Sequence, residues 1–273
     1  MTIKLVAFDM DGTFLNDQNT YNHQRYGALL PKLRQRGIRV VAASGSQYQR
    51  LQTQFGAFQD QMDFVSQNGA VVHSDGQLLR VTAMPASAVR TTLVAIARAF
   101  TASEVAEHLV VGVKSAYVDQ LISDASWQQT YHYYDHLQRV PNLAGVTAAR
   151  LNDQITSIGI TFAEQVNFQR ALTRLRPQLP AGVTSQTSGY QTELISAATV
   201  NKGAGIRELQ NKYGIADDEL MTFGDNENDL SMLTVTPHAY AMANAVEHVK
   251  ARVPHQTTSN NAEGVLDVLS RLV

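Results

Sequence analysis

Short apolar runs alternate with amphipathic stretches in the first quarter of the chain. The runs are rich in aliphatic and β-branched side chains, as buried strands are, and the stretches between them repeat leucine at helical spacing. Gly37 is placed to end the first helix, and Pro31 inside it predicts a kink or a later start. The predicted elements are strands at 3–8, 38–43 and 64–66, a helix at 24–36 and a helix through Arg50 and Leu51.

The pattern changes in the middle third, where alternation between apolar and polar positions indicates half-exposed strands. An alanine-rich helix is expected first, and this region also holds a cluster of aromatic residues. We expect a smaller α+β domain inserted into the chain at about 82–189. Its predicted elements are helices at 87–100 and 165–175 and strands at 109–118, 155–162 and 183–188.

Alternation of strand and helix returns after this insertion, which predicts a doubly wound parallel sheet with helices on both faces. The fold class is therefore α/β, with a core formed by residues 1–81 and 190–273 and split by the inserted domain. The predicted elements are helices at 202–213, 229–233 and 264–272 and strands at 220–223 and 239–242.

The amino-acid composition excludes cysteine-based chemistry and argues against several kinds of binding partner. The chain has 273 residues and no cysteine, which excludes disulfides, thiol nucleophiles and cysteine-ligated metals. Lys and Arg total 22 against 24 Asp and Glu, a formal charge of −2 that does not favour nucleic-acid or membrane partners. No apolar run reaches the length of a membrane span, and the N-terminus does not have the pattern of a signal peptide. A cytoplasmic protein is expected.

Polar residues follow four of the predicted strands, and parallel strands present their carboxyl ends at the same edge of a sheet. Carboxylates gathered there repel one another and need a cation, and a set of oxygen ligands without cysteine suits Mg²⁺. The four strand ends are Asp9-x-Asp11-Gly12, Ser44-Gly45, Asn68-Gly69 and Gly224-Asp225-x-x-Asn228-Asp229.

The first of these segments has two interpretations. It is either a polar turn after a strand or a catalytic pair. As a pair, Asp9 would attack phosphorus and form an aspartyl-phosphate, and Asp11 would act as general acid and then as base. Ser44 and Gly45 are likewise either an ordinary helix N-cap or a cradle for phosphate made by a hydroxyl and backbone N–H groups.

The later segments also have two interpretations. Lys202 is either a solvated lysine in a first helical turn or a fixed charge on phosphoryl oxygens. The DNEND run at 225–229 is either a turn with a helix cap or part of a metal site. In a metal site, Asp225 would be a ligand, and Asp229 would orient Lys202 or a metal-bound water.

Together these segments resemble the haloacid dehalogenase superfamily of phosphatases, and more narrowly its Cof-type members with a C2B cap. The resemblance covers nearly the whole chain. It rests on Phe8-Asp9-Met10-Asp11-Gly12-Thr13 with Leu15, Ala43-Ser44-Gly45, Ser66-Gln67-Asn68-Gly69-Ala70, Lys202-Gly203, and 224–229 with Met232-Leu233.

The resemblance implies a role for each matching residue. Asp9 would be the nucleophile and a Mg²⁺ ligand, and Asp11 the acid and base that also contacts the metal through its backbone carbonyl. Asp225 would complete the metal site with support from Asp229. Ser44, Gly45, Lys202 and Asn228 would bind the phosphoryl group. The insertion would be a cap that shapes the substrate pocket and excludes water.

One position departs from the family pattern. An arginine often follows the Ser-Gly pair in such proteins, and here the residue is Ser46, so Arg50 is the candidate to replace it. Substrate contacts are expected from the cap. The candidates are Lys114, Tyr117, Tyr190 and Gln191.

The leading hypothesis is a Mg²⁺-dependent phosphatase of small phosphorylated metabolites, with sugar phosphates as the substrates that the resemblance favours. One alternative is a phospho-acceptor signalling module, but such a module carries its acceptor aspartate after a middle strand, where this chain has Ser66-Gln67-Asn68. Another alternative is a catalytically silent scaffold of the same superfamily. Such a scaffold is expected to lack one of the catalytic residues, but this chain retains Asp9, Asp11, Lys202 and Asp225. The sequence leaves the oligomeric state open.

Overall fold

The computed structural model describes residues 2–187 and 191–273 and divides them into two compact units. The first unit comprises Met1–Arg80 and Asn201–Val273, and the second comprises Val81–Val200. The predicted insertion, 82–189, lies within the second unit. None of the described helices has the length and apolar character needed to cross a bilayer.

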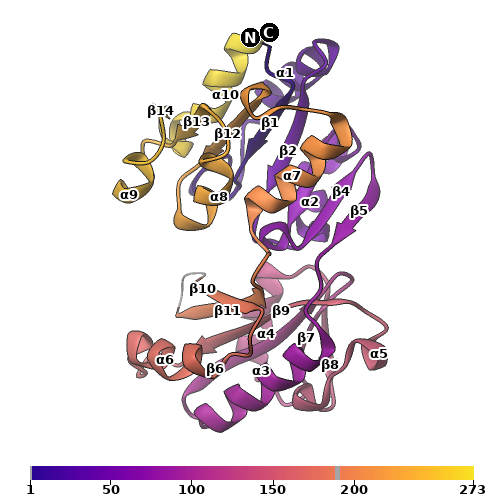
Figure 1. The fold of residues 1–273 in the computed structure, drawn as a ribbon, viewed down its shortest axis with the longest axis vertical. Helices are drawn as coiled ribbons and strands as arrows, with labels where there is room; N and C mark the ends of the chain where they lie inside the picture. Colours follow the sequence, from indigo (N-terminus) through magenta and orange to yellow (C-terminus); the bar gives the residue numbers. More distant parts are fainter. Residues whose placement is uncertain (1, 188–190) are drawn as a thin grey trace. The chain divides into compact units, whose positions relative to one another are not determined.

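The first unit is built on an eight-stranded sheet (Figure 1). Every neighbouring pair from β14 to β3 is parallel, and β4 then runs antiparallel to β3. In sheet order the strands are β14 (His255–Gln256), β13 (His238–Ala241), β12 (Leu220–Gly224), β1 (Leu5–Phe8), β2 (Arg39–Ala43), β3 (Asp63–Ser66), β4 (Val71–Ser74) and β5 (Gln77–Val81).

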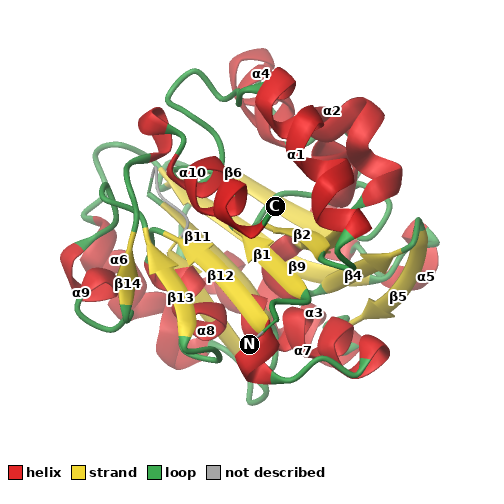
Figure 2. Cartoon of the chain, turned by 90° about the horizontal axis from the view of Figure 1, so that it is seen from above, coloured by secondary structure: helices red, strands yellow, loops and turns green. Residues whose placement is uncertain are grey.

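Helices cover both faces of this sheet, which confirms the expected α/β class. In Figure 2, α1, α2 and α10 lie on one face, and α7 and α8 lie on the other. Because both faces are covered, the central strands are buried, and β1, β3 and β12 are buried at every position. The helices are α1 (His23–Gln35), α2 (Tyr48–Phe55), α7 (Lys202–Tyr213), α8 (Leu230–Leu233), α9 (Glu247–Lys250) and α10 (Gly264–Leu269).

The first helix runs through Pro31 without interruption. The expected late start is wrong, because α1 already begins at His23, where the side chain of Asn22 caps it by accepting from the N–H of Arg25. Gly37 follows the helix with a φ of +73°, the left-handed conformation that commonly ends a helix.

The second unit is a six-stranded sheet. Helices α3 and α6 pack on one face, against Val110, Ile158 and Ile195. Alternate residues of the same strands, such as Leu109 and Val111, pack on the other face with residues of α4 and its flanks. In sheet order the strands are β10 (Val183–Thr187), β11 (Thr192–Ala197), β9 (Ile155–Phe162), β6 (Val105–Gly112), β7 (Ala116–Asp119) and β8 (Leu137–Val140), and the helices are α3 (Ala86–Ala99), α4 (Asp124–Tyr133), α5 (Ala148–Leu151) and α6 (Phe168–Leu175).

The expected continuous strand at 109–118 is wrong, because β6 and β7 form an antiparallel hairpin there. The turn at 113–115 is held by the buried carboxylate of Asp153, which accepts from the N–H groups of Val113, Lys114 and Ser115 and from the hydroxyl of Tyr117. The turn cannot be predicted from the residues at 113–115, because the residue that stabilises it, Asp153, lies far away in the sequence.

A buried histidine in β4, His73, packs against an aromatic ring. The ring of His73 stacks on Tyr48, with centroids 3.5 Å apart and an interplanar angle of 5°. Its side chain is 9% exposed, and its Nδ1 has no hydrogen-bond partner in the described chain. Burial lowers the pKa of His73 to about 4, so the folded protein favours the neutral ring.

We predict that the free energy of unfolding falls as the pH is lowered from about 6.5 towards 4. In this window the unfolded chain binds a proton at His73 that the folded chain does not bind. The loss from this group between pH 7 and pH 5 is about 2 kcal/mol. Urea unfolding at several pH values, in the wild type and in His73→Phe, measures it. The phenylalanine keeps an aromatic ring against Tyr48, and its pH dependence should be weaker by this amount. Identical pH dependence in the two proteins would contradict the prediction.

Candidate active site

The four predicted polar segments follow strands that are neighbours in the sheet. In the order β12, β1, β2 and β3, the strands end at Gly224, Phe8, Ala43 and Ser66. These strands are parallel, so the next residues emerge at one edge. The structure therefore brings Asp225, Asp9, Ser44 and Asn68 to the same rim of the first unit.

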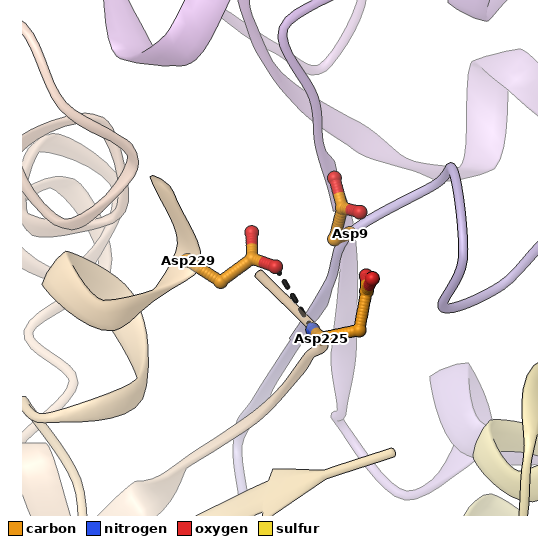
Figure 3. A group of neighbouring side chains, drawn as sticks. All are labelled: Asp9, Asp225 and Asp229. Carbon is orange, nitrogen blue, oxygen red and sulfur yellow. Dashed lines mark hydrogen bonds between the residues drawn. The ribbon is translucent and has the colours of Figure 1, made fainter. Parts of the chain in front are cut away.

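A group of three carboxylates lies at this rim. One oxygen from each of Asp9, Asp225 and Asp229 lies within 4.8 Å of the others (Figure 3). Asp229 is fully buried and Asp9 is nearly so, at 7% exposed. Water therefore screens the repulsion between these carboxylates poorly. Asp11, by contrast, is exposed and is not a member of this group.

Lys202 lies beside the carboxylates, and its side chain is fully buried. Its Nζ donates to Oδ1 of Asp9 and, at 2.7 Å, to Oδ1 of Asp229. Burial alone would lower the pKa of Lys202, but the carboxylates of Asp229 and Asp9 raise it above the usual value. The lysine is therefore a fixed positive charge, and the first of its two interpretations, a solvated lysine, is wrong.

The local fold positions Lys202 at the start of α7. The side chain of Asn201 caps this helix by accepting from the N–H of Ala204, and the N–H of Gly203 donates to the hydroxyl of Ser231 at 3.1 Å. Gly69 has a φ of +97° and lies against the backbone carbonyl of Asn201, where a Cβ atom would collide. The close approach of these backbones brings the lysine to the edge of the sheet.

Asp229 holds the DNEND segment as well as the lysine. Its Oδ2 accepts from the N–H of Asp225 at 2.9 Å and from the N–H of Asn226 at 3.0 Å. Figure 3 shows the first of these bonds, which turns the segment back on itself after β12. Both oxygens of Asp229 are therefore occupied by protein donors, which suits a supporting residue better than a metal ligand.

Asp225 is positioned by two residues that directly follow Asp11. The hydroxyl of Thr13, which is 1% exposed, donates to Oδ1 of Asp225 at 2.7 Å. Gly12 has a φ of +80°, and a Cβ atom there would lie 2.6 Å from Oδ2 of Asp225. The glycine thus leaves room for the carboxylate. The sequence motif contains Thr13 but predicts no role for it. Its place two residues after Asp11 is the one signal that could have indicated this contact.

The electrostatics of the group call for a cation. Burial and the neighbouring Asp229 raise the pKa of Asp9 well above its usual range, and the same causes raise the pKa of Asp225 to about 6. When all three carboxylates are ionised, one ammonium leaves two negative charges uncompensated, and the raised pKa values reflect burial together with this repulsion. A divalent cation would balance the two charges, and an all-oxygen donor set fits Mg²⁺.

The candidate phosphate-binding residues lie at the same rim. Ser44 is buried, its hydroxyl accepts from the N–H of Ser46 at 3.0 Å, and Gly45 beside it is exposed. Asn228 donates from Nδ2 to Oδ1 of Asn68 at 3.2 Å. Arg50 lies half-buried in α2, and its part in substrate binding stays a prediction.

Among the residues of the insertion that are expected to contact the substrate, Tyr117 stabilises the turn between β6 and β7. It is 3% exposed, and its hydroxyl donates to Asp153 at 2.8 Å within the second unit. Lys114 donates from Nζ to the carbonyl of Asn152. Tyr190 lies outside the described residues, and substrate contacts by Lys114 and Gln191 stay predictions.

Comparison with known proteins identifies the family. A family model described as haloacid dehalogenase-like hydrolase matches residues 6–269. The phosphatase YbjI of Escherichia coli, named for 5-amino-6-(5-phospho-D-ribitylamino)uracil, is 35% identical over 275 residues, which cover 100% of this chain and 97% of YbjI.

Two solved structures share the fold. SMU.1108c from Streptococcus mutans superposes with a TM-score of 0.86 at 27% identity, covering 99% of this chain and 98% of that one. The subclass IIB sugar phosphatase BT4131 superposes with a TM-score of 0.79 at 18% identity, covering 99% and 100%. These matches confirm both the resemblance and the fold class, and the similarity to a named phosphatase supports the expected enzyme class, a phosphoric monoester hydrolase. The chain belongs to the haloacid dehalogenase-like hydrolase family.

Proposed function

We propose that this protein is a Mg²⁺-dependent phosphatase of small phosphorylated metabolites that works through an aspartyl-phosphate. The observation that carries the proposal is the grouping of Asp9, Asp225 and Asp229 beside the buried Lys202 at the carboxyl edge of a parallel sheet. A carboxylate nucleophile there would have a fixed positive charge beside it in Lys202, and Asp225 would be near enough to share a divalent cation with it.

Asp9 is proposed as the nucleophile. Lys202 holds its Oδ1, and no donor in the described chain is bonded to Oδ2. In the first step an oxygen of Asp9 attacks phosphorus, the bond from phosphorus to the ester oxygen breaks, and Asp11 gives its proton to the leaving alcohol. In the second step Asp11 takes a proton from water, the water oxygen attacks phosphorus, and the bond to Asp9 breaks to release orthophosphate.

The remaining residues of the site would bind the metal ion and the phosphoryl group and keep them in position. Asp9, the backbone carbonyl of Asp11 and Asp225 would hold the Mg²⁺, which supplies positive charge to the phosphoryl oxygens. Asp229 keeps Lys202 and the DNEND segment in place. The hydroxyl of Ser44, the N–H of Gly45, the amide of Asn228 and the ammonium of Lys202 would bind the phosphoryl group. The exposure of Asp11 suits a residue that exchanges protons first with the alcohol and then with water.

We further propose that the substrate carries its phosphate on a primary hydroxyl of a sugar or polyol chain. The similarity to YbjI supports this class, because the compound in its name bears a phosphorylated ribityl chain. The expected sugar phosphates share this chemistry. A cytoplasmic location would give the enzyme access to such metabolites, and it remains part of the proposal.

Hydrolysis of an aryl phosphate with and without Mg²⁺ tests the proposal. The wild type should release phosphate only with Mg²⁺, and Asp9→Asn should lose at least about a thousandfold in rate because a neutral amide is a poor nucleophile. The control is Asp218→Asn, which removes an exposed carboxylate on the 3₁₀ turn Asp217–Glu219. A phosphorylated ribityl or sugar substrate should be tested in parallel. Asp9→Asn with wild-type activity would contradict the covalent mechanism.

We predict that the hydroxyl of Thr13 tightens Mg²⁺ binding by fixing Asp225. Thr13→Val keeps the shape of the side chain but removes the donor, so the half-saturating Mg²⁺ concentration should rise about tenfold or more. Thr13→Ser keeps the hydroxyl and should stay near the wild type. Mg²⁺ titrations of the phosphatase activity compare the three proteins. Equal half-saturation in the wild type and Thr13→Val would show that Thr13 does not support the metal site.

A further inference from the structure

The turn that follows β3 holds an unusual backbone conformation. Gln67, Asn68 and Gly69 have φ angles of +51°, +54° and +97° in succession. A left-handed conformation is uncommon for one residue other than glycine, and here two such residues adopt it side by side. Such a conformation persists only where the surrounding structure fixes it, and strained residues of this kind are concentrated at functional sites.

The turn is fixed by the segment with the proposed phosphate-binding residues. The N–H of Gln67 donates to the carbonyl of Ser46, and the N–H of Asn68 donates to the carbonyl of Ser44, both at 2.9 Å. Gly69 packs against the backbone of Asn201. The conformation therefore depends on Ser44–Ser46 and on the residue that caps the helix of Lys202.

The side chain of Asn68 spans the rim. Strands β12 and β3 are separated by β1 and β2, which places them about 14 Å apart at the usual strand spacing. The bond from Nδ2 of Asn228 to Oδ1 of Asn68, at 3.2 Å, nonetheless joins the segments that follow these two strands. The bond therefore links segments on either side of β1 and β2, and Asp9 directly follows β1.

This bond also sets the orientation of the Asn68 amide. Its Oδ1 accepts from Asn228, so its Nδ2 is the group that remains to donate. A Cβ atom on Gly45 would lie 3.4 Å from both Nδ2 and Oδ1 of Asn68, which places the amide directly beside the exposed glycine of the proposed phosphate cradle. The Nδ2 donates no hydrogen bond to a residue of the described chain.

We propose that the side-chain amide of Asn68 binds an oxygen of the phosphoryl group, as a further donor beside Ser44, Gly45 and Asn228. This inference rests on the proposed phosphatase function and assigns a binding role to a residue outside the mechanism proposed above. The left-handed backbone aims the amide at the rim. Asparagine suits the position, since it tolerates this conformation and offers a neutral donor that does not repel a phosphate dianion.

Binding of orthophosphate in the presence of Mg²⁺, measured by calorimetry, tests the inference without turnover. Asn68→Gly removes the amide and keeps the left-handed backbone without strain. It should weaken orthophosphate binding about tenfold, while the thermal midpoint stays within about 3 °C of the wild type. The matched control is Asn19→Gly, an exposed asparagine of the same unit with a φ of +56°, which should bind like the wild type.

Asn68→Asp separates binding from positioning. It keeps an oxygen that can accept from Asn228 but replaces the donor with a carboxylate, so it should bind orthophosphate at least as weakly as Asn68→Gly. Wild-type affinity in Asn68→Gly would overturn the inference. Wild-type affinity in Asn68→Asp with weak binding in Asn68→Gly would show that Asn68 acts only by holding Asn228, and the direct contact would be wrong. If the wild type neither binds orthophosphate nor releases it from an aryl phosphate, the proposed function fails together with this inference.

Discussion

The burial of one ammonium among carboxylates determines the arrangement of the site. Removing a lysine from water costs several kcal/mol unless charged partners surround it, and Lys202 is 0% exposed. Its partners, Asp9 and Asp229, come from the ends of different elements, so the pairing fixes β1, α7 and the DNEND segment against one another. The same partners bring more negative charge than one lysine neutralises. The carboxylates that make burial of Lys202 possible therefore also leave an excess of negative charge, and the proposed divalent cation would neutralise it.

Much of the first unit is predictable from the sequence because its signals are local. Buried parallel strands appear as apolar runs, and the rule that ligands lie beyond the carboxyl ends of strands is enough to group Asp9, Ser44 and Asp225 at one rim. The helix at Lys202–Tyr213 has the predicted bounds, and in the second unit the strand at Ile155–Phe162 has them as well. The charged interior is harder to foresee, since only tertiary packing shows that Lys202 is buried.

The features that the sequence does not reveal depend on partners far away in the chain. The turn between β6 and β7 is held by Asp153, and β11 is recognisable mainly from its pairing with β9 and β10. Thr13 and Asn68 lie in motifs that the sequence singles out, but their contacts cannot be predicted from it. Their partners, Asp225 and Asn228, lie 212 and 160 positions away. A polar residue in a turn gains a functional meaning only when its partner is known.

The central claim is that Asp9 and Asp225, in the carboxylate group beside Lys202, bind a divalent cation. Calorimetric titration of the metal-free protein with Mg²⁺ tests this claim most directly. We expect binding of Mg²⁺ at one site in the wild type and a loss of that binding in Asp225→Ala. Circular dichroism of the variant would show that the fold is retained. A wild type that binds no Mg²⁺, or a folded Asp225→Ala protein that binds it as tightly as the wild type, would contradict the claim.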